Sequence, residues 1–321
     1  MPNIRPEPGT DQPSDQPSDP TRLPPTSRPG PVRLQVADLS QSLDWYGEVL
    51  GVRVLDSGRG WIRLGAHPAA HPAADPAAPL VELVERPGAA PVPRGGHLGL
   101  FHVAILLPDR ASLGRFVAHL GRLRIPAGSA DHLVSEALYL NDPDGLGFEV
   151  YADRPPASWA RTSSGEIAMA SNPLALDELG RAGGDAPWTG LPSGARVGHL
   201  HLHVGDLAAA EAFYSEALGL DVQVRSYPGA LFLSAGGYHH HLGVNTWARR
   251  AGAAGPNDAR LLSWSLELPS SEAVEAALTR LEEAGHAVTR SEPGIGRVPD
   301  PWGTELRVQA PPRGPRDLPA G

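Results

Sequence analysis

The chain has 321 residues, of which 41% are hydrophobic, and a formal net charge of −9. All of its strong cations are arginines, and no basic run stands out, which argues against nucleic acid or an anionic membrane as a partner. It has no cysteine, which excludes disulfides, thiolate metal sites and cysteine nucleophiles. Any metal must therefore be held by His, Asp or Glu.

The first 29 residues are rich in Pro, Asp and Ser and carry almost no large apolar side chain, so we expect a disordered tail at 1–29. This start lacks the apolar core of a secretory signal, and no apolar run approaches the length needed to span a bilayer. We therefore expect a cytoplasmic protein with no membrane partner. A second short tail is expected at 311–321.

An internal repeat organises the rest of the chain. The segments "VADLSQSLDWYGEVLGVRV" from Val36 and "VGDLAAAEAFYSEALGLDV" from Val204 each predict a strand, an Asp helix cap, an amphipathic helix and a Gly stop. Further strand–helix patterns lie at 101–120 and 262–281, and a turn followed by a strand closes each half of the chain, at 141–150 and 299–308.

These patterns predict an α+β fold of four βαβββ modules, paired in sequence order into two half-barrel domains. The N-terminal domain is expected at 30–153 and the C-terminal domain at 194–310. A linker at 154–193 joins them and contains one short predicted helix at 173–180.

A first candidate site lies in the first half. His102 is in a strand that is apolar on both faces, and Glu149 is in the apolar run "GFEVY". A buried histidine needs a partner, and a buried carboxylate is costly without a cation. A lone buried histidine is more often bonded to backbone, but a metal ion between His102 and Glu149 satisfies both groups.

The residues around Glu149 form a spaced pattern. It runs His132, five residues, Leu138-Tyr139, two residues, Asp142-Pro143, one residue, Gly145, three residues, Glu149. This pattern resembles the signature of type I extradiol ring-cleavage dioxygenases. The region from about 30 to 310 also resembles two-domain CatE-type catechol 2,3-dioxygenases of the vicinal oxygen chelate superfamily, with landmarks such as "GHLHLHVGDL" and "GGYHHHLGVNTW".

The resemblance implies a role for each matching residue. His132 is expected as an acid/base beside the metal ligands, Tyr139 as a substrate-binding group, and Glu149 and His102 as ligands. The family's first-strand histidine falls at Pro31, so the first half lacks one ligand.

A second candidate site lies in the second half. His199, His201 and His203 alternate and should share one face of a strand. The place of His241 resembles that of the fourth-strand ligand in glyoxalases, and Glu305 is matched with Glu149 in the closing strand. We favour His199, His241 and Glu305 as a two-histidine, one-carboxylate set with open positions, and keep His102 with Glu149 as a rival.

In the second half, His201 and His239 are the candidates for catalytic groups beside the metal. We expect a metal-dependent extradiol dioxygenase acting on a catechol-type aromatic with O2. Fe(II) is the expected metal, with Mn(II), Ni(II) or Zn(II) as alternatives. The sequence leaves the oligomeric state open, and a homo-oligomer is one option. Two other functions fit the same fold: a glyoxalase-like isomerase, epimerase or thiol transferase, and a metal-free drug-binding resistance protein.

Overall fold

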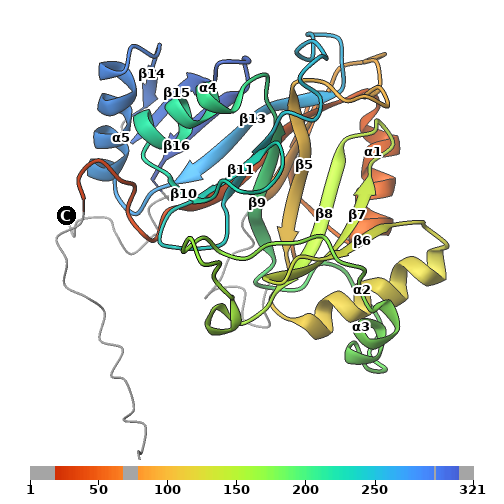
Figure 1. Ribbon diagram of the computed structural model, residues 1–321. Helices are drawn as coiled ribbons and strands as arrows, with labels where there is room; N and C mark the ends of the chain where they lie inside the picture. Colours follow the sequence, from red (N-terminus) through yellow and green to blue (C-terminus); the bar gives the residue numbers. More distant parts are fainter. Residues whose placement is uncertain (1–18, 68–78, 293, 311–321) are drawn as a thin grey trace, which may run out of the picture.

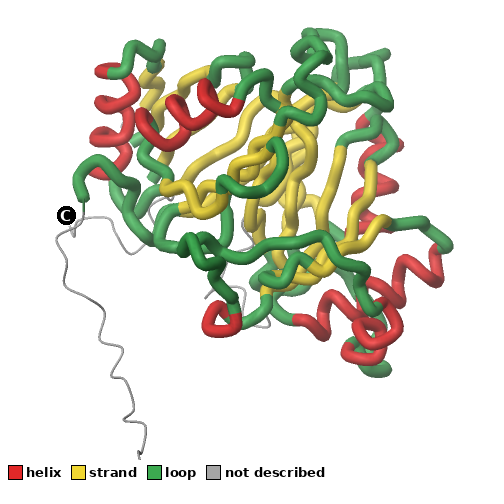
Figure 2. The backbone as a smooth tube through the Cα atoms, viewed as in Figure 1, coloured by secondary structure: helices red, strands yellow, loops and turns green. Residues whose placement is uncertain are grey.

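The computed structural model describes residues 19–67, 79–292 and 294–310. The tail at 311–321 and most of the tail at 1–29 lie outside these residues. Two eight-stranded sheets lie in the middle of the molecule, and the helices lie at its periphery (Figures 1 and 2). No helix among the described residues is long and apolar enough to cross a membrane.

One sheet, the middle sheet, is built from the central part of the chain. Its strand order is β10-β11-β12-β9-β5-β8-β7-β6. Its strands are β5 (Gly99–Leu106), β6 (Gly128–Asp131), β7 (Ser135–Asn141), β8 (Gly147–Asp153), β9 (Arg196–His203), β10 (Asp221–Val224), β11 (Ala230–Ser234) and β12 (Leu242–Asn245).

The other sheet, the terminal sheet, joins strands from the two ends of the chain. Its strand order is β14-β15-β16-β13-β1-β4-β3-β2. Its strands are β1 (Arg28–Val36), β2 (Arg53–Gly58), β3 (Trp61–Gly65), β4 (Pro79–Glu85), β13 (Arg260–Glu267), β14 (Thr289–Glu292), β15 (Ile295–Pro299) and β16 (Glu305–Gln309).

The four modules are present, but they do not pair in sequence order. The second module pairs with the third through the antiparallel strands β5 and β9, and the first pairs with the fourth through β1 and β13. The expected grouping into 30–153 and 194–310 therefore does not match the sheets. A repeat shows which segments are alike, and equivalent edge strands can pair in more than one combination.

The segment between the second and third modules is also structured. It contains the 3-10 turn η2 (Pro156–Ser158) and the helix α3 (Leu176–Ala182), which begins and ends slightly later than the predicted helix. Residues 19–29, expected as part of the tail, are packed: Leu23 is buried, and its backbone N–H donates to the Gly219 carbonyl.

The helices of the internal repeat begin where the sequence predicts. Asp38 and Asp206 cap α1 (Leu39–Trp45) and α4 (Leu207–Glu211), and each helix continues into a π-helical turn, η1 (Tyr46–Leu50) or η3 (Ala212–Ala217). Asp109 and Ser270 cap the longer helices α2 (Arg110–Leu123) and α5 (Ser271–Glu283).

One face of each sheet packs with the helices in a common hydrophobic core. In the middle sheet Val103 and Ile105 belong to this core, and in the terminal sheet Trp264 and Leu266 do. Because side chains alternate along a strand, the residues between them point to the opposite face of each sheet. Those two opposite faces carry the polar groups described below.

Candidate metal centre

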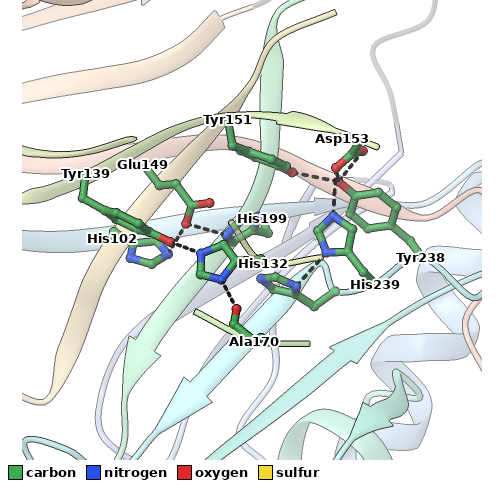
Figure 3. A network of polar contacts seen from close by, with 11 residues as sticks. His102, His132, Tyr139, Glu149, Tyr151, Asp153, Ala170, His199, Tyr238 and His239 are labelled. Atoms are coloured by element: carbon green, nitrogen blue, oxygen red, sulfur yellow. Dashed lines mark hydrogen bonds and ion pairs between the residues drawn. The ribbon is translucent and has the colours of Figure 1, made fainter. Parts of the chain in front are cut away.

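Three side chains from adjacent strands meet on the polar face of the middle sheet. His102 is on β5, Glu149 on β8 and His199 on β9, and β5 lies between the other two strands. Both Glu149 and His199 are register partners of Ala104, whose small side chain lets them approach each other above it. Glu149 Oε2 lies 3.2 Å from His199 Nε2 and 3.0 Å from His102 Nε2 (Figure 3).

All three side chains are buried, with relative exposures of 5% for His102, 2% for Glu149 and 1% for His199. Burial raises the pKa of the Glu149 carboxyl, but the facing imidazoles of His199 and His102 outweigh burial and hold that pKa well below its usual range. Burial lowers the pKa of His199 to about 4 against the opposing pull of Glu149. At neutral pH the site therefore holds an ionised carboxylate beside a neutral imidazole, the states that metal ligands require.

The donor atoms fit a divalent cation. The ligand atoms of His102, Glu149 and His199 all lie within 4.8 Å of one another. Within the described part of the chain, His102 Nε2 has no hydrogen-bond partner although it lies close to the carboxylate. Two imidazole nitrogens and one carboxylate oxygen facing a common point match the two-histidine, one-carboxylate arrangement of metal centres with open positions.

The three side chains open into a cavity of about 240 Å³. The lining residues are mostly aromatic or apolar: Phe101, His102, Ala130, His132, Tyr139, Glu149, Met169, Ser171, His199, His201, Tyr227, Phe232, His240 and Trp247. Trp247 and Phe101 are exposed large hydrophobic residues, and their rings meet edge to face at 5.6 Å. Small-molecule sites typically combine such apolar walls with a few convergent polar groups.

His132 and Tyr139 form a hydrogen-bonded pair at the cavity wall. His132 Nδ1 lies 2.6 Å from the Ala170 carbonyl oxygen, and its Nε2 lies 2.5 Å from the Tyr139 hydroxyl (Figure 3). A carbonyl can only accept, so Nδ1 carries the proton and Nε2 accepts from Tyr139. Burial and the nearby Glu149 charge raise the pKa of Tyr139, which keeps its phenol protonated.

The other two predicted catalytic histidines lie at different depths. His201 lines the cavity, and burial, reinforced by the charge of His102, lowers its pKa well below the usual value. His239 is not one of the lining residues: its Nε2 is 2.9 Å from Asp153 Oδ1 and its Nδ1 is 2.7 Å from His240 Nδ1. Tyr238 also donates to Asp153, at 2.9 Å.

The sequence model of the family described as the Glyoxalase/Bleomycin resistance protein/Dioxygenase superfamily matches residues 28–150 and 196–307 of this chain. The chain belongs to this superfamily. A catechol-2,3-dioxygenase of Bacillus subtilis (strain 168) is 41% identical over 275 residues, which cover 85% of this chain and 93% of that protein.

Solved structures support the superfamily fold. A Bacillus subtilis protein described as a candidate dioxygenase has a TM-score of 0.61 at 12% identity, covering 91% of this chain and 87% of that one. A single-residue mutant of glyoxalase I from Zea mays has a TM-score of 0.53 at 17% identity, covering 89% of this chain and 94% of that one. At these identities the two likenesses show the fold alone.

In this superfamily member the ligand set favoured from the sequence does not come together. His241 precedes β12; its Nδ1 accepts from the Ala235 backbone N–H at 3.2 Å, and its ring stacks on Tyr238 at 4.9 Å. Glu305 lies on β16 in the terminal sheet. Only His199 of that set lies in the cluster, where it joins His102 and Glu149.

The pairing of modules explains this outcome. The first module offers Pro31 where the resemblance implies a histidine, but the second module pairs with the third instead of the first. The third module's first strand, β9, brings His199 to the position that Pro31 leaves without a donor. His199 of the favoured set and the two residues of the rival site, His102 and Glu149, thus form one cluster shared between the halves of the chain.

Strand register also corrects the match between Glu305 and Glu149. In the middle sheet Ala104 pairs with Glu149, and in the terminal sheet Ser265, at the equivalent place in its strand motif, pairs with Arg307. Glu305 pairs with Ser263 and follows its turn more closely than Glu149 follows its own. Arg307 therefore stands where the middle sheet has Glu149.

Two further histidines beside the cavity, His240 and His203, are buried. The ring of His240 lies 4.1 Å from that of His199, and His203 Nδ1 lies 2.7 Å from Asn245 Oδ1. Alternation did not identify His240 because β12 begins only at Leu242, so a period of two does not apply to the loop before it.

Proposed function

We propose that this chain is an extradiol ring-cleaving dioxygenase that acts on a catechol-type aromatic with O2 and holds Fe(II) through His102, His199 and Glu149. The observation that carries the proposal is a buried two-histidine, one-carboxylate cluster opening into an aromatic cavity beside a histidine–tyrosine pair. The similarity to a catechol-2,3-dioxygenase over most of both chains supports it.

When bound, Fe(II) would supply a Lewis acid that stabilises the negative charge developing on the substrate oxygens and brings the reactants together. His102, His199 and Glu149 would hold it through one donor atom each, and their side chains face the cavity that would take the reactants. A catechol has two adjacent hydroxyl groups and one flat ring, and both match a small cavity with aromatic walls.

The chain's own residues then position the ring and move protons. Phe101 and Trp247 flank the cavity with aromatic surface, which orients a flat ring and excludes water from it. His132 holds a lone pair at Nε2, fixed by the Nδ1–H donation to Ala170, and can take a proton from a catechol hydroxyl. Tyr139 stays protonated; when its hydroxyl hydrogen turns from His132 Nε2 to a negatively charged substrate oxygen, the Nε2 lone pair becomes free to take the proton.

The test is direct. Protein made without a histidine tag is stripped of metal and reloaded anaerobically with Fe(II), and a panel of catechols is followed in air for the yellow ring-cleavage product. We expect turnover with Fe(II) and bound iron close to one per chain. No product from any catechol would contradict the proposal, and equal ring cleavage with Zn(II) or Ni(II) would contradict the assignment of Fe(II).

A further inference from the structure

The polar face of the terminal sheet carries a cluster of arginines. Arg33 on β1 and Arg63 on β3 flank Glu82 on β4 and share its carboxylate, at 2.6 Å to Oε1 and 2.9 Å to Oε2. Both arginine side chains stay about half exposed, with relative exposures of 46% and 47%. This part of the face is open to solvent, and one carboxylate serves two guanidinium groups.

Two more arginines lie farther along the same face. Arg297 on β15 and Arg307 on β16 are direct cross-strand partners. Among the described residues neither forms an ion pair or a side-chain hydrogen bond, and the Nε of each is buried without a partner. Like charges directly opposite each other destabilise a sheet. Burial, followed by the charge of Arg297, lowers the pKa of Arg307.

The floor between these arginines is small and polar. Ser263 pairs with Arg33 across β1 and β13, and Ser265 pairs with Arg307 across β13 and β16. Both serines are buried, so each places a hydroxyl group beneath the longer arginine side chains. Further carboxylates of the face come from Glu305, from Asp56, 3.8 Å from Arg63, and from Glu267, 3.3 Å from Arg28. By contrast, Arg297 and Arg307 are arginines of this face for which the described residues provide no ion pair.

This part of the terminal sheet is equivalent in position to the metal cluster of the middle sheet, but it carries positively charged groups where the middle sheet carries a carboxylate. Ser263 stands at the position of His102 in its strand motif, and Arg307 stands at the position of Glu149. The unpaired guanidinium groups of Arg297 and Arg307 beside serine hydroxyls provide mainly donors, and guanidinium groups bind carboxylate and phosphate oxygens in a two-pronged geometry.

We propose that the arginine face of the terminal sheet is a binding site for a small oxyanion, phosphate or carboxylate, contacted by Arg33, Arg297 and Arg307. An anion there relieves the repulsion between Arg297 and Arg307 and occupies their free donors. The proposal is independent of the metal cluster, because it uses none of the residues of the middle sheet.

The experiment measures binding of inorganic phosphate and of succinate to the full chain by isothermal titration calorimetry, and the rise in melting temperature with each anion. Chloride at equal ionic strength is the salt control. We expect saturable binding and a melting temperature that rises with anion concentration. The tighter of the two anions distinguishes a phosphate ligand from a carboxylate ligand.

Arg307→Met should weaken the binding by roughly tenfold or more, since it removes charge-assisted hydrogen bonds. Arg297→Met is the second variant if the first does not fold. Arg122→Met removes the same charge from an exposed position on α2 and should leave binding unchanged. Absence of binding by both anions, or an equal effect of Arg122→Met and Arg307→Met, overturns the proposal.

Discussion

Ala104 in the middle sheet and Ser265 in the terminal sheet occupy the same point of the same strand motif, and each has a parallel partner across from it. For Ala104 that partner is Glu149, and for Ser265 it is Arg307. In the middle sheet, imidazoles surround a carboxylate at this point. In the terminal sheet, guanidinium groups lie beside serines. The backbone arrangement is the same in both sheets, while the charge that each face can accept is opposite.

The features common to both sheets are structural. Tyr46 donates to Asp142 at 3.0 Å, and Tyr214 donates to Asp300 at 2.8 Å, so each helix is fastened to the closing turn of the next module in the same way. The side chains on the polar faces differ. In this duplicated fold the turns and caps build the frame, and a few positions on one face decide the chemistry.

The largest difference between the two sheets is expected in metal binding when one carboxylate is removed from the polar face of each. Glu149→Gln should lower metal affinity by more than ~100-fold, because it removes a direct ligand and even outer partners of ligands account for roughly 10–100-fold. Elemental analysis after dialysis and the rate of catechol cleavage measure the loss. The matched variant Glu305→Gln should keep both, and an equal loss in the two variants would sink the assignment of the metal to the middle sheet.

The next largest effect is expected at the histidine–tyrosine pair. His132→Gln should lower kcat by roughly 100-fold or more, because it removes a base that accepts a proton, while the bound metal stays unchanged. His119→Gln, at a partly exposed histidine on α2, is the control and should have wild-type kcat. If His132→Gln also empties the metal site, its role is structural and the proton-transfer role is wrong.

The tyrosine–aspartate hydrogen bond that both halves share should make folding stability depend on pH to a different extent in each half. Burial raises the pKa of Asp142 to about 7, against hydrogen bonds from Leu146 N–H and Tyr46, and Asp144 raises it further. The folded pKa lies above the unfolded one, so the stability from this carboxyl is full below about pH 4 and is lost as pH rises through about 7.

The stability of wild type relative to Asp142→Asn should therefore decrease from pH 5 to pH 8, with a slope of at most about 1.4 kcal/mol per pH unit. Asp300→Asn should show the same sign and a smaller slope, because Trp302 takes the place of the charged Asp144. Melting temperatures by calorimetry across this range measure both. A difference that is independent of pH would show that Asp142 is not protonated in the folded state near neutrality.

The smallest effect concerns Glu82. Its ion pairs involve half-exposed arginines, so Glu82→Gln should cost at most about 1 kcal/mol of folding free energy in a denaturant titration. The same variant frees Arg33 and Arg63 and should tighten phosphate binding to the terminal sheet. Unchanged phosphate affinity in Glu82→Gln would place the anion site away from Arg33.

Much of the fold was predictable because its signals are local. Asp38, Asp109 and Asp206 cap helices by accepting backbone N–H groups three residues on, and the superfamily expected from the spaced motifs is confirmed. The pairing of modules was predicted wrongly, since β1 pairs with a strand more than half the chain away, and no local pattern encodes which of several equivalent edges it meets.

The candidate site could also be predicted only where its signals are local. His102 and Glu149 were identified through a motif within one module, and the structure brings them together. Their neighbour His199 was placed with His241 and Glu305 because the halves were treated as separate units. Glu305 was matched with Glu149 as the glutamate of the closing strand. The spacing from the turn already argues against that match, because Glu149 stands seven residues after Asp142 and Arg307 stands seven residues after Asp300, and strand register agrees that Arg307 takes the place of Glu149.

The strands of the middle sheet lie in the sequence between the strands of the terminal sheet, and this arrangement determines which sheet can form first during synthesis. Arg28 meets its partner Glu267 only after β13 has been synthesised, whereas β5 to β12 are complete at Asn245, 22 residues before Glu267 and 64 residues before the end of β16. The part that gathers the imidazoles can consequently assemble first, and the opening strand waits for the closing one. A proteolytic nick between the second and third modules would separate His199 from its two companions in sequence, so each fragment alone would carry an incomplete centre.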